Sequence, residues 1–171
     1  MLTLCGYEIC ADEKKESGVF DISAGKSVIR FTGGELTVSF SSGRYDLSLV
    51  TTGECFISSV ALSGPMEKYE TESAFLGSGF TSSSPCGAFG SDEKQPSSAV
   101  SDAFNPASGK TGVHVSDMFF FHGRRGSGNG MLVAQYPPFN QFVGFTFRFG
   151  KQHNDVTVRW DLERSFKRRE E

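Results

Sequence analysis

The sequence predicts an all-β protein, an antiparallel β-sandwich or jelly-roll-like domain, and two observations support this fold class. First, short apolar stretches are separated by turn-forming residues in the C-terminal third, at 118–121, 131–133, 145–149 and 156–160. Second, 17 Phe residues can fill a core between sheets, and 20 Gly residues provide the positive φ angles of tight turns. The C-terminal pattern is typical of an antiparallel meander.

The length of 171 residues suits one β-rich domain spanning 1–171. Strand-rich blocks at 19–62 and 113–162 flank a long insertion at 63–112, and the two blocks are candidates for the two sheets of the sandwich. Ser, Gly and Pro occupy 22 of the 50 positions in the insertion, which has no sustained period of 2 or 3.6. Its phenylalanines, Phe75 and Phe89 among them, indicate that parts of it pack on the sheets.

The first block begins with a hairpin signal. A strand at 28–31 leads through Gly33 and Gly34 into 35–40, where apolar and polar residues alternate. Glycine accepts the positive φ angles of the primed turns whose twist matches paired strands. Further strands are expected at 45–50 and 55–62.

The second block has the clearest alternation of the chain. Phe145, Phe147 and Phe149 alternate with polar residues, and the same period recurs at 156–160. Each of these strands is therefore expected to bury one face.

The last residues differ from the strands in composition. Residues 161–171 favour helix, and Leu162 and Phe166 stand four apart, which predicts a short C-terminal helix.

The cysteine usage favours a reducing compartment. Four cysteines in a chain of this length fall short of the density of a disulfide scaffold. The first residues lack the features of a secretory signal, and no apolar run reaches the length of a membrane span. We therefore expect a cytoplasmic or other reducing interior location, and no membrane span.

The loop 122–130 is the most distinctive local motif. Its four glycines can expose backbone N–H groups, and Arg124 and Arg125 can each form forked hydrogen bonds with a phosphate or carboxylate. The alternative is a solvated connection between two strands, because glycine-rich hairpin loops are common.

Basic residues concentrate toward the C-terminus. Residues 120–171 hold nine basic and five acidic side chains, a local charge of +4. This excess suggests weak binding of RNA or another polyanion as an alternative function, and it is modest beside the basic stripes of dedicated nucleic-acid binders. The candidate residues are Arg124, Arg125, Lys151, Arg159, Arg164, Lys167, Arg168 and Arg169.

Catalytic and cofactor motifs are not visible. His114, His122 and His153 lack metal-ligand spacing, and no serine lies in a nucleophile elbow, so we expect neither a metal nor a cofactor. A hydrolase or carbohydrate-active protein is the second alternative, because three-dimensional geometry rather than spacing defines a triad. It would require a pocket that brings a histidine beside a carboxylate or cysteine.

By exclusion, the sequence favours a non-catalytic binding or assembly module. We expect it to contact a protein partner, or a larger assembly, through loops and sheet edges held on a rigid β-scaffold.

Overall fold

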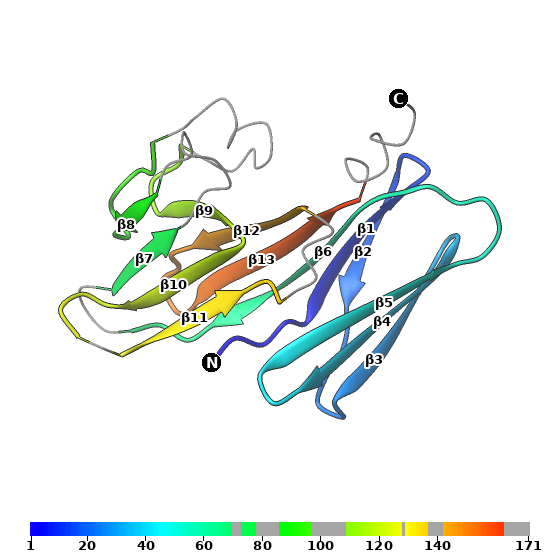
Figure 1. Cartoon of the computed structure of the whole chain (residues 1–171), viewed down its shortest axis with the longest axis horizontal. Helices are drawn as coiled ribbons and strands as arrows, with labels where there is room; N and C mark the ends of the chain where they lie inside the picture. The colour runs from blue at the N-terminus through cyan, green and yellow to red at the C-terminus, as the bar shows by residue number, and fades with distance from the viewer. Residues whose placement is uncertain (70–72, 78–85, 97–108, 128, 137–141, 163–171) are drawn as a thin grey trace.

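The computed structural model describes residues 1–69, 73–77, 86–96, 109–127, 129–136 and 142–162, and every helix or strand assigned among them is a β-strand (Figure 1). The all-β class is confirmed. The strands are β1 (Gly6–Ala11), β2 (Lys14–Val19), β3 (Lys26–Phe31), β4 (Gly34–Ser41), β5 (Arg44–Thr51), β6 (Ile57–Met66), β7 (Ser73–Gly77), β8 (Gly87–Phe89), β9 (Val113–Asp117), β10 (Phe119–Arg124), β11 (Gly130–Ala134), β12 (Phe142–Arg148) and β13 (Asn154–Asp161).

The described residues form three antiparallel sheets, and none of these closes on itself. The largest has the order β2-β1-β6-β13-β12-β9, the second β11-β10-β7-β8 and the third β3-β4-β5. Figure 1 shows the four-stranded and three-stranded sheets at opposite ends of the long axis of the molecule.

The two sequence blocks do not form separate sheets, so that expectation is wrong. β6, from the first block, pairs with β1 on one side and with β13, from the second block, on the other. Pairing with strands that are distant in the sequence decides which sheet a strand joins. The local alternation of apolar and polar residues shows which face of a strand is buried and does not show which strands pair.

The prediction that the C-terminal strands form one antiparallel meander is also wrong. β10 and β11 form one hairpin, β12 and β13 form another, and the two hairpins belong to different sheets. The predicted faces are nevertheless confirmed, because Phe145, Phe147, Val156 and Val158 are all buried.

The segment predicted as an irregular insertion contains regular structure. β6 continues to Met66, and β7 and β8 both fall within 63–112. Gly77 shows why the composition misled: a Cβ at this position would lie 2.8 Å from Cε1 of Phe75, so the glycine makes room for a core ring. Phe75 is fully buried, which confirms the expectation that parts of the segment pack on the sheets. Residues 78–85 and 97–108 lie outside the described residues.

Two-residue turns connect the N-terminal hairpins. Ser42 and Gly43, with φ of 50° and 79°, join β4 to β5, and Asp12 and Glu13, with φ of 47° and 64°, join β1 to β2. The second turn contains no glycine, so the sequence pattern did not indicate it and the first block was taken to begin only at residue 19.

The apolar residues form two clusters on one face of the six-stranded sheet. One packs β1 and β6 against β3 and β4 and is mainly aliphatic; the other packs β12 and β13 against β7 and β10 and is rich in phenylalanine. Trp160 and Leu2 contact both clusters. We call these the aliphatic cluster and the aromatic cluster.

The C-terminal helix prediction falls mostly on residues that the structure does not describe. Asp161 is the last residue of β13, Leu162 follows it, and 163–171 lie outside the described residues. Within the described part of the chain, no helix long and apolar enough to cross a membrane is present.

Candidate functional site: an apolar groove beside an unpaired sheet edge

An apolar groove of about 1510 Å³ lies where the two clusters meet. β5 lines one part of it and β11 another, and residues of the N-terminus, β4, β6, β12 and β13, including Trp160, also contribute to the lining. A site of this size exceeds the roughly 300–1,000 Å³ of most small-molecule pockets. Its dimensions suit a segment of polypeptide better than a metabolite.

The groove exists because the aliphatic cluster is incompletely covered at β5. On β4, the inward-facing Leu36 and Val38 are 1% and 0% exposed. On the neighbouring β5, Leu47 and Leu49 face the same cluster and remain half-buried. β4 has a strand on each side, whereas β5 is the edge strand of its sheet. The two leucines therefore present apolar surface to the groove.

The turn between β4 and β5 fixes the direction of the β5 backbone groups. In a hairpin with a two-residue loop, the residues that flank the loop exchange hydrogen bonds, and every second pair then does the same. Ser41 and Arg44 flank the loop and are therefore a hydrogen-bonded pair. The hydrogen bond from Thr52 N to Gly33 O, 2.8 Å long, falls at a position where the same alternation places one. It follows that Tyr45, Leu47 and Leu49 direct their N–H and C=O groups away from β4.

Other sheet edges are protected against additional strands. At β9, the outward-facing N–H and C=O of Val115 both bond the side-chain amide of Gln95, at 2.6 and 2.8 Å, and Gln95 is 1% exposed. The edge of β3 carries Lys26 and Arg30, the edge of β2 carries Lys15, and β8 has only three residues. Charged side chains and short strands are common means of preventing edge-to-edge pairing.

The two edges that line the groove lack such protection in the described part of the chain. On β5, the residues whose backbone N–H and C=O groups point away from β4 are Tyr45, Leu47, Leu49 and Thr51, none of which is charged. β11 has the same character, and its Leu132 is 63% exposed.

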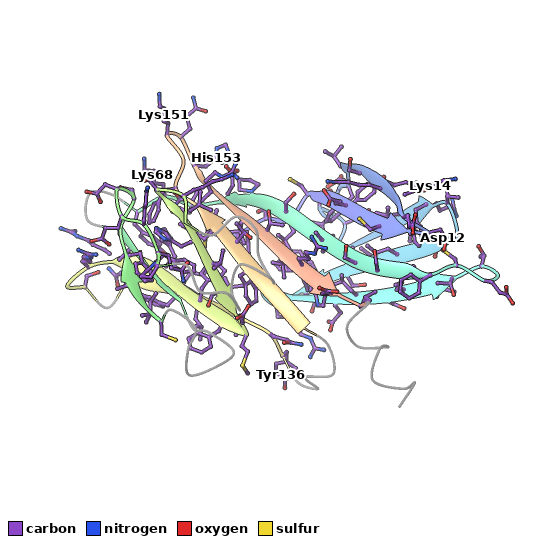
Figure 2. The ribbon with its side chains drawn as sticks, turned by 90° about the horizontal axis from the view of Figure 1, so that it is seen from above. Asp12, Lys14, Lys68, Tyr136, Lys151 and His153 are labelled. Atoms are coloured by element: carbon purple, nitrogen blue, oxygen red, sulfur yellow. The ribbon has the colours of Figure 1, made fainter. Side chains whose placement is uncertain are left out.

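The groove has a polar rim at the start of β5. The guanidinium of Arg44 lies 4.7 Å from the ring centroid of Tyr136, and its Nε donates to Asp46 Oδ1 at 2.8 Å. Figure 2 shows Tyr136 projecting from the body of the protein. Arg44 thus links the β4–β5 turn to the segment that follows β11.

The histidines do not converge on the groove. His114 is fully buried and its Nε2–H donates to the carbonyl of Gly90 at 2.8 Å, while its ring stacks on Phe75 and Phe89. Burial lowers the pKa of His114, and the Gly90 hydrogen bond and Glu93 offset this in part. A neutral ring held in this way is part of the core.

His122 was expected in a loop and lies instead in β10, fully buried. Its ring centroid is 4.7 Å from that of Phe147 and 5.1 Å from that of Tyr69, and Nε2 lies 3.5 Å from Asn154 Nδ2. Burial lowers the pKa of His122 to about 4. Nδ1 of both buried histidines has no hydrogen-bond partner among the described residues.

The third histidine lies on the surface. His153 Nε2 is 3.3 Å from Asp155 Oδ1, and both side chains are more than half exposed. Within the described ranges no three His, Cys, Asp or Glu side chains are grouped so that they could hold a metal ion.

The predicted anion loop is shorter than the sequence indicated, because His122 to Arg124 belong to β10 and Gly130 to β11. Gly123 and Gly130 make room for the ring of Phe121, whose Cε1 would lie 2.7 Å from a Cβ at Gly123. Arg125 Nη2 forms an ion pair with Glu93 at 3.1 Å.

The ion pair with Arg125 also affects the pKa of Glu93. The backbone N–H of Gly90 and the guanidinium of Arg125 both lower the pKa of the Glu93 carboxyl. The neighbouring Arg124, at the end of β10, is exposed.

The remaining basic candidates lie apart. Lys151 is exposed in the turn between β12 and β13, where Lys68 Nζ donates to the carbonyls of Gly150 and Lys151, and Figure 2 shows both lysines with His153 at one end of the molecule. Arg159 is exposed on β13, pointing away from the clusters. The other four, Arg164, Lys167, Arg168 and Arg169, lie outside the described residues.

Comparisons with protein-family models, curated proteins and solved structures found no match.

Proposed function

We propose that this protein is a non-catalytic binding or assembly module that holds a segment of a partner protein in the groove between β5 and β11. The observation that carries the proposal is the combination of half-buried leucines at Leu47 and Leu49 with backbone groups on the same strand that no other described strand pairs with. Partly covered apolar surface next to an open sheet edge is the arrangement that peptide-binding β-proteins use.

The wider architecture supports this role. We propose a single domain in the form of an antiparallel sandwich, with the six-stranded sheet as one layer and the two smaller sheets sharing the other. The clusters on one face of the large sheet support this arrangement. The groove is then the place where the second layer is interrupted.

A reducing interior compartment remains our proposal for the location. No disulfide links the four cysteines, all of which are among the described residues.

Two alternatives are less well supported. Polyanion binding stays a prediction, because Arg125 is paired with Glu93, and Lys151 and Arg159 belong to separate surfaces. Hydrolysis would need a histidine beside a carboxylate in the groove, and none of the three histidines lines it.

A peptide-display selection against the full chain tests the proposal. Twelve-residue peptides that bind should change the fluorescence of Trp160, the single tryptophan, because its side chain lines the groove. Leu47→Lys places a charge in the groove and should abolish both binding and the fluorescence change. The matched control is Val50→Lys, because Val50 is 59% exposed on the other face of β5 and its replacement should preserve both.

The outcome that would refute the proposal is equally specific. If the selection gives no peptide whose binding is lost in Leu47→Lys and kept in Val50→Lys, the groove is not a protein-binding site.

A further inference from the structure

We propose that the occupant of the groove is an extended peptide segment that adds to β5 as an antiparallel strand, with apolar side chains at alternate positions. This inference rests on the proposed function and goes further by specifying the conformation and the chemistry of the partner segment.

The backbone of β5 has an open edge in the described part of the chain. Tyr45, Leu47 and Leu49 direct their N–H and C=O groups away from β4, and among the described residues no strand pairs with that edge. A neighbouring strand can therefore exchange hydrogen bonds with three successive alternate residues of β5. Unpaired main-chain groups of this kind give strand addition its affinity.

The side chains of β5 at the same three positions line the groove. In an antiparallel pair, directly opposite residues project on the same side. Residues of the segment opposite Tyr45, Leu47 and Leu49 would thus enter the groove, and the surrounding surface selects apolar side chains at those positions.

β5 also carries charged side chains at the rim of the groove. Arg44 and Asp46 alternate with those three residues along β5, form an ion pair with each other and lie at the polar rim of the groove. A basic side chain opposite Asp46 and an acidic one opposite Arg44 would be favourable, while the reversed arrangement would place like charges together. Read in the antiparallel direction, the preferred segment is apolar, any residue, apolar, basic, apolar, acidic.

A second copy of this chain is a poorer occupant. The edge strand of a second copy would bring its whole sheet with it. The space beside β5 is bounded by other parts of this chain, because β11 and the N-terminal residues Met1, Leu2 and Leu4 also line the groove. The site is therefore suited to a single extended strand from an arm or a loop.

Amide hydrogen exchange followed by NMR tests the inference on the full chain. In the free protein, the amides of Tyr45, Leu47 and Leu49 should exchange fast, and those of Asp46 and Ser48, which bond β4, should exchange slowly. Saturation with a selected peptide should slow the first set at least about tenfold and leave the second set nearly unchanged.

Two designed six-residue peptides of identical composition test the charge rule. Both carry Ile, Val and Val at the inner positions; one has Lys opposite Asp46 and Glu opposite Arg44, and the other exchanges the two. The first should bind several-fold more tightly, and the preference should disappear in the double variant Arg44→Ser, Asp46→Ser.

The outcomes separate the two proposals. Selected peptides that require an unaltered groove but protect no alternate amides of β5 would overturn strand addition and leave the proposed function intact. A concentration-dependent dimer, detected by light scattering and abolished by Leu47→Lys, would also overturn it, because the edge would then serve self-association.

Discussion

The aromatic and aliphatic clusters lie on the same face of one sheet and differ in how they are covered. Phe75, Phe120, Phe145 and Phe147 are at most 2% exposed, and β7 and β10 cover that half. In the aliphatic half, coverage ends at β5, where Leu47 is only half-buried. The difference teaches that the position of a sheet edge, more than the identity of the apolar residues, decides whether a core is sealed or available for binding.

The largest expected effect is in the sealed half. Phe120→Ala should lower the free energy of unfolding by about 3–5 kcal/mol, because it removes a fully buried ring that packs on Phe75 and Phe145. Urea denaturation measures this loss. Phe56→Ala is the matched control: its ring is 51% exposed and its removal should cost less than about 1 kcal/mol.

Acid should weaken the sealed half specifically. Burial lowers the pKa of His122 to about 4, whereas an unfolded histidine titrates near 6.5. As the pH falls, the unfolded chain therefore binds the proton before the folded protein does. The contribution of the neutral, buried His122 to the free energy of unfolding is complete above about pH 6.5 and is lost as the pH falls toward 4. The loss should reach about 2–3 kcal/mol.

Denaturation at several pH values measures that loss. It should shrink in His122→Phe and persist in His153→Phe, since His153 is on the surface. An identical pH profile in His122→Phe would show that the acid sensitivity arises elsewhere.

The protected edge offers a contrast with the open one. Gln95→Ala leaves the N–H and C=O of Val115 without their buried partner and should cost about 1–3 kcal/mol. The freed β9 edge should also make the protein self-associate at high concentration, which sedimentation can detect. Unchanged stability would mean that water replaces the amide without cost.

The smallest effect is expected at the groove. Leu47→Ala should cost about 1 kcal/mol, because its side chain is only partly buried. Leu36→Ala, at a position that is 1% exposed on the adjacent strand, should cost about 2–5 kcal/mol. Equal losses in urea denaturation would contradict the view that the aliphatic cluster is open at β5.

The sequence was most informative about faces. The alternation of Phe145 and Phe147 follows from the geometry of a strand with one buried side, and both residues are buried as predicted. The alternation at Leu36 and Val38 is the same as that at Leu47 and Leu49. Only the pairing of distant strands makes β5 an edge, so the groove was not visible in the sequence.

Glycine was the main source of error. Gly123 and Gly130 were interpreted as loop residues, and the structure places them in strands beside the ring of Phe121. A glycine that makes room for a ring and a glycine that forms a turn are the same letter in the sequence. For that reason His122 was assigned to an exposed loop although it lies in the core.

The central position of β6 has a consequence for folding during synthesis. β6 can pair with β1 as soon as both have left the ribosome, but its other neighbour, β13, is made much later. Until then one side of β6 has no neighbouring strand, and such non-local closure is slow. The nascent chain is thus expected to keep one edge of β6 open until β13 emerges.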